Sequence, residues 1–73
     1  MSKNLENLAV LVKYLSDNLD QNYHQHHPEA TEICMQSLQM IFQDHPRLRK
    51  KFPDTIKIML AIDTEALKEA QLP

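Results

Sequence analysis

The chain has 73 residues, which is enough for one domain over 1–73 and too few for a second core. Its net charge of −2 gives no general attraction to nucleic acid or anionic lipid, and the complete absence of glycine excludes glycine-rich loops that bind phosphates or dinucleotides. A single cysteine, Cys34, excludes an intramolecular disulfide and is typical of a reducing compartment, so we expect a cytoplasmic location.

The sequence also lacks the pattern of a membrane or export segment. Its longest apolar run near the N-terminus covers residues 8–12 and ends at Lys13. A run of this length is too short to span a membrane, and no small-residue cleavage site of a signal peptide accompanies it. We therefore expect no membrane partner.

The first predicted element is an amphipathic helix. Apolar residues recur at alternating spacings of three and four, which places them on one face of a helix. This apolar stripe consists of Leu5, Leu8, Val12, Leu15 and Leu19. Leu11 and Tyr14 lie beside the stripe, and we expect the helix to end between Asp20 and His27.

A second helix is predicted from Pro28 to Gln43. Proline suits the first position of a helix, and Glu29 and Glu32 lie where the positive end of the helix dipole favours them. Met40 is expected at the periphery of the buried face. That face should contain Cys34, Met35, Leu38, Ile41 and Phe42.

A short basic connector follows the second helix. His45 and Pro46 repeat the start signal, so residues 47–51 are predicted to form one helical turn before Phe52 and Pro53 break it.

Two interpretations compete for the remainder of the chain. Good helix formers and helical spacing predict a third helix from Pro53 to Gln71, whereas residues 55–62 also alternate as a strand would. The main stripe of this helix consists of Ile56, Met59, Leu60, Asp63, Leu67 and Ala70, with Asp63 as its one polar interruption. A strand here could pair only with another copy of the chain, because no other strand is predicted, so we favour the helix. Asp63 is a candidate cap for a separate terminal helix in either case. The predicted fold is therefore all-α, a small bundle of three main helices, with one strand across a dimer as the alternative.

Histidines cluster between the first two helices, at His24, His26 and His27. If the first helix extended this far, Asp20, His24 and His27 would share one face and form a candidate metal site. Pro28 opposes this geometry, because the residue before a proline avoids helical angles. We therefore expect an exposed polar loop, with no metal and no cofactor.

No set of residues predicts catalysis. Cys34 is expected to be a small buried hydrophobe, and the carboxylates fall on helix faces or helix starts that should be solvated. We expect that the protein is not an enzyme.

The positive charges are concentrated in segment 47–57. This basic patch consists of Arg47, Arg49, Lys50, Lys51 and Lys57. It indicates either a surface that contacts phosphates or a hydrated connector. Phe52 is the only aromatic residue among them, and the helix that follows is too apolar to read a DNA groove. We expect an acidic protein partner in preference to nucleic acid.

More apolar positions are present than a small core of three helices needs. Those outside the main stripes are Leu11, Tyr14, Met40, Ile58 and Ile62. We expect a homodimer through the first or the third helix, with Leu11, Tyr14, Ile58 and Ile62 at the interface. The predicted function is a non-enzymatic helical protein-interaction module, a self-associating small regulator or adaptor. The alternatives are a nucleic-acid-binding protein that uses segment 47–57 and a metal binder that uses the histidine cluster.

Overall fold

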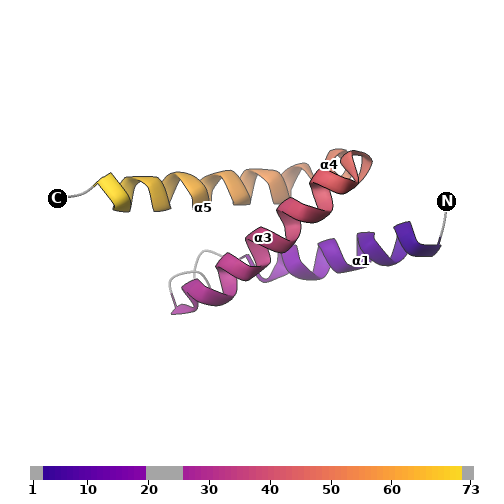
Figure 1. The fold of residues 1–73 in the computed structure, drawn as a ribbon, viewed down its shortest axis with the longest axis horizontal. Coiled ribbons are helices and arrows are strands. Elements are labelled where there is room, and N and C mark those ends of the chain that lie inside the picture. Colours follow the sequence, from indigo (N-terminus) through magenta and orange to yellow (C-terminus); the bar gives the residue numbers. More distant parts are fainter. Residues whose placement is uncertain (1–2, 20–25, 72–73) are drawn as a thin grey trace.

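A computed structural model describes residues 3–19 and 26–71. These residues form four helices, and none of them lies in a strand (Figure 1). The helices are α1 (Lys3–Asp17), α3 (Pro28–Asp44), α4 (Pro46–Lys51) and α5 (Pro53–Gln71). The all-α prediction is confirmed. The alternative of a strand over 55–62 is wrong, because these residues lie inside α5, where the helix satisfies their backbone groups without a second strand.

The helices form an elongated bundle with extents of 49 × 20 × 17 Å. Figure 1 shows α1 and α5 running in the same general direction, with α3 running in the reverse direction and crossing α1 obliquely. The short α4 joins the end of α3 to the start of α5. The C-terminal half of α5 extends past the first turn of α3.

Prolines begin three of the helices. Pro28, Pro46 and Pro53 are the first residues of α3, α4 and α5, where a missing N–H costs nothing. The residues before two of them are extended, with φ −132° and ψ 74° at His45 and φ −126° and ψ 60° at Phe52. No residue in the described ranges has a positive φ, so the chain changes direction without glycine.

One hydrophobic core receives a side chain from each helix and from the segment after α1. Leu48 is 1% exposed, so α4 is anchored in this core and is more than a hydrated connector. Full burial of such a side chain contributes roughly 1.5–3 kcal/mol. The buried apolar residues are Val12, Leu19, Met35, Leu38, Phe42, Leu48, Met59 and Ile62.

The buried face of α3 follows the predicted stripe. Met35, Leu38 and Phe42 are buried in the core, and Cys34 and Ile41 are half-buried against it. Met40 is exposed at the periphery, as expected.

The buried face of α5 differs from the predicted one. Thr55, Met59 and Ile62 point into the core, whereas Leu60 and Leu67 are about 60% exposed. The prediction that Ile62 is uncovered is therefore wrong, since it is 5% exposed. Ile58, the other predicted interface residue of this helix, is half-buried against the core. The prediction that Asp63 begins a separate helix is also wrong, because α5 continues through it.

Candidate interaction surfaces

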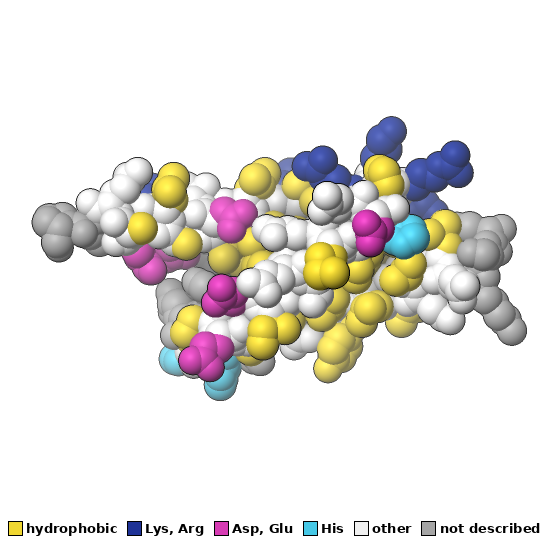
Figure 2. Space-filling view, in the orientation of Figure 1, with side chains coloured by type: hydrophobic (Ala, Val, Ile, Leu, Met, Phe, Trp, Pro, Cys, Tyr) yellow, Lys and Arg dark blue, Asp and Glu magenta, His cyan; other side chains and the backbone are white. Residues whose placement is uncertain are grey.

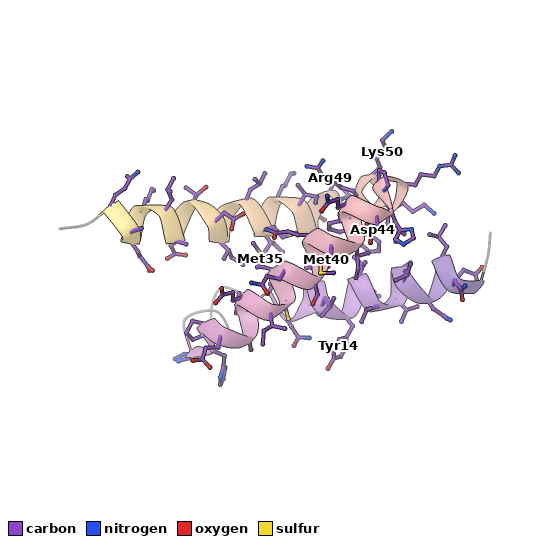
Figure 3. All side chains as sticks on the ribbon, viewed as in Figure 1. Tyr14, Met35, Met40, Asp44, Arg49 and Lys50 are labelled. Atoms are coloured by element: carbon purple, nitrogen blue, oxygen red, sulfur yellow. The ribbon has the colours of Figure 1, made fainter. Side chains whose placement is uncertain are left out.

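The first candidate surface lies across α1 and α3, and we call it the α1–α3 face. It consists of Leu11 and Tyr14 from α1 and of Ile33 and Met40 from α3, all exposed. Figure 3 shows Met40 on the front of α3 and Tyr14 projecting from α1 below it. In the same orientation, Figure 2 shows hydrophobic side chains gathered over both helices.

Helical geometry explains why these side chains remain outside the core. Met40 is two residues from the buried Leu38 and from the buried Phe42, a rotation of about 200° about the helix axis in each case. Met40 therefore points away from the core that Leu38 and Phe42 enter. Ile33 precedes Met40 by seven residues, or about two turns, and so shares its side of α3.

The second candidate surface is a groove between α3 and α5, closed at one end by α4. Its volume is approximately 350 Å³. The apolar part is formed by Phe42 from α3 and by Ile56, Met59 and Leu60 from α5. Its polar rim consists of Gln39, Gln43, Arg49 and Asp63. We call it the α3–α5 groove.

A third opening lies on the other side of Asp63, between the start of α3 and the middle of α5. It measures approximately 330 Å³. Met35, Ile62 and Ala66 supply apolar lining, and Glu32 and Asp63 supply carboxylates. The opening lies where α3 and α5 separate, between the hydrophobic core and the last turns of α5.

The last part of α5, residues 63–71, contains no buried or half-buried residue. Every residue in it is exposed, including Leu67 at 61%. We call this segment the α5 tail. It contains three acidic residues, Asp63, Glu65 and Glu69, and one basic residue, Lys68, which gives a net charge of −2.

Charges of opposite sign occupy the two ends of the molecule. The basic patch lies on α4 and the early part of α5, and all of its side chains are exposed (Figure 2). The start of α3, with Glu29 and Glu32, and the α5 tail lie at the other end. The structure thus brings the predicted basic patch together on neighbouring helices, with Asp44 and Asp54 as acidic residues beside it, and places Glu29, Glu32, Glu65 and Glu69 toward the other end. The members of the patch are Arg47, Arg49, Lys50, Lys51 and Lys57.

Of the three candidate metal ligands, only His27 lies among the residues that the structure describes. Asp20 and His24 lie outside the described residues, and His27 precedes the first residue of α3. The His27 carbonyl accepts hydrogen bonds from the Thr31 backbone N–H at 3.1 Å and from Thr31 Oγ1 at 3.2 Å. Within the described ranges, no three histidine, cysteine, aspartate or glutamate side chains are grouped as metal ligands.

Sequence reasoning missed four exposed apolar residues: Val10, Ile33, Leu60 and Leu67. Ile33 lies outside the predicted buried face of its helix, and this position could have indicated that its side chain is exposed. Leu60 and Leu67 belonged to a helical stripe that was assigned to the core, and no sequence signal distinguished that stripe from the neighbouring one.

Comparison of the chain with protein-family models, with curated proteins and with solved structures found no match. None of the helices in the described part of the chain is long and apolar enough to cross a membrane.

Proposed function

We propose that this protein is a non-enzymatic helical protein-interaction module that self-associates and acts as a small regulator or adaptor. The observation that carries the proposal is that three helices keep large apolar side chains in water after the core has closed. They form the α1–α3 face and the exposed edge of the α3–α5 groove. Small domains bury a limited fraction of their surface, so association is a common source of additional stability.

A second copy of the chain is the partner that the charge distribution favours. The end with α4 is basic and the end with the α5 tail is acidic, so two copies placed in opposite directions attract at both ends. Closed two-fold dimers are the commonest oligomers, and apolar burial stabilises them by about 25 cal/mol per Å² of surface removed from water.

Sedimentation equilibrium over a wide concentration range tests this function. We expect the wild type to form dimers at micromolar concentration. A variant with Leu11→Lys, Met40→Lys and Leu60→Lys, which alters both surfaces at exposed positions, should remain monomeric and helical by circular dichroism. A wild type that stays monomeric at high micromolar concentration would contradict the proposal.

A further inference from the structure

The α5 wall of the α3–α5 groove continues into the α5 tail as one stripe. Ile56, Leu60, Asp63, Leu67 and Ala70 follow one another at spacings of four, three, four and three. This is the spacing of a coiled-coil seam, which packs against a second helix. Ile56 and Leu60 line the groove, whereas Leu67 and Ala70 lie beyond it on the tail.

A covering element would stabilise the α5 tail. Most helical stability in proteins comes from packing of an apolar face. The tail is helical to Gln71, yet every one of its residues is exposed.

We propose that α5 of one copy lies antiparallel along α5 of a second copy, so that each tail occupies the α3–α5 groove of the other copy. This proposal rests on the proposed self-association and specifies its interface. Leu60 of each copy then lies opposite Leu67 of the other, which pairs the two large exposed apolar residues of the stripe. The contact is the same for both copies, so the dimer closes.

The charges select the antiparallel arrangement. It places the tail of one copy, with a net charge of −2, beside Arg49 on the rim of the other copy's groove. A parallel arrangement would place the two basic patches together and the two tails together. Like charges placed against each other destabilise an interface, so the parallel arrangement is disfavoured.

The effect of single lysine substitutions on dimerisation tests this interface. Leu67→Lys and Met40→Lys are a matched pair, because the two side chains are 61% and 65% exposed and both are far from the core. We expect Leu67→Lys to weaken the dimer roughly a hundredfold, since each dimer loses two buried leucines. Met40→Lys should leave the dissociation constant unchanged, and circular dichroism should show that both variants fold.

The outcomes separate the interface from the proposed function. A dimer that is weakened by Met40→Lys and unaffected by Leu67→Lys would overturn the α5 interface while leaving self-association intact. A monomeric wild type would overturn both.

Disulfide trapping checks the direction and register of the two helices. In a Cys34→Ser background, proteins with the single substitutions Leu60→Cys and Leu67→Cys are mixed and oxidised. We expect the mixed disulfide between the two proteins to exceed either symmetric disulfide, because the symmetric pairs are offset by about 10 Å along the helices. A predominance of symmetric disulfides would contradict the antiparallel arrangement.

Discussion

Ser16 on α1 and Thr55 on α5 are joined by a hydrogen bond of 2.7 Å between Oγ and Oγ1. Ser16 also donates its only hydroxyl hydrogen to the Val12 carbonyl oxygen at 2.6 Å, so Thr55 is the donor to Ser16. Thr55 is 4% exposed, and this contact satisfies a polar group within the core. The pair therefore connects the first and last helices across 39 residues of sequence.

We expect this hydrogen bond to contribute to stability by coupling the two helices. Thr55→Val keeps the shape of the side chain and removes the donor, and should lower the free energy of unfolding by about 1 kcal/mol. A double-mutant cycle with Ser16→Ala, followed by urea denaturation, measures the coupling. Strict additivity of the two substitutions would show that the contact contributes nothing.

Leu48 should be the residue on which the position of α4 depends. Leu48→Ala removes a side chain that is 1% exposed, and we expect a loss of roughly 2–5 kcal/mol in the free energy of unfolding. Arg47→Ala, next to it and exposed, is the control and should change stability by less than about 0.5 kcal/mol. Similar denaturation midpoints for the two variants would refute the anchoring role of Leu48.

Asp63 lies in the α5 stripe close to the centre of the proposed dimer, where two copies of its carboxylate approach each other. We expect Asp63→Leu to tighten the dimer, because it removes this repulsion and extends the apolar seam. Asp54→Leu, at an exposed position in the first turn of α5, is the control and should have no such effect. Weaker association of Asp63→Leu in sedimentation equilibrium would count against the α5 interface.

The basic patch should bind DNA weakly and without sequence preference. Its side chains can neutralise phosphates, so any affinity should fall steeply as salt rises. Fluorescence anisotropy with labelled duplexes at several salt concentrations measures this. Tight, sequence-dependent binding at physiological salt, lost in a variant with Arg47, Arg49, Lys50 and Lys51 all changed to Ala, would instead support a nucleic-acid-binding function.

Removal of metal ions should leave the protein's stability unchanged. A structural metal contributes folding free energy directly, so a site formed by Asp20, His24 and His27 would make the melting temperature sensitive to EDTA. We expect identical melting curves with and without the chelator. A metal ion that native mass spectrometry finds in a one-to-one complex after purification would contradict this expectation.

The sequence by itself determined where α3, α4 and α5 begin, whereas α1 ends at Asp17, before the range from Asp20 to His27 that the sequence predicted. Pro28, Pro46 and Pro53 define the starts of α3, α4 and α5, because proline suits the first helical position and restricts the residue before it. The predicted third helix and α5 have the same limits. The spacing of apolar residues also identified most of the buried face of α3.

Only the tertiary structure decided which face of α5 is buried. A helix with 3.6 residues per turn offers overlapping apolar stripes, and spacing alone does not rank them. Leu60 and Ile62 belong to two different stripes of α5. The stripe with Ile62 is buried because it faces the core that α1 and α3 complete. Thr55 lies on the same face because Ser16, distant in sequence, satisfies its hydroxyl group.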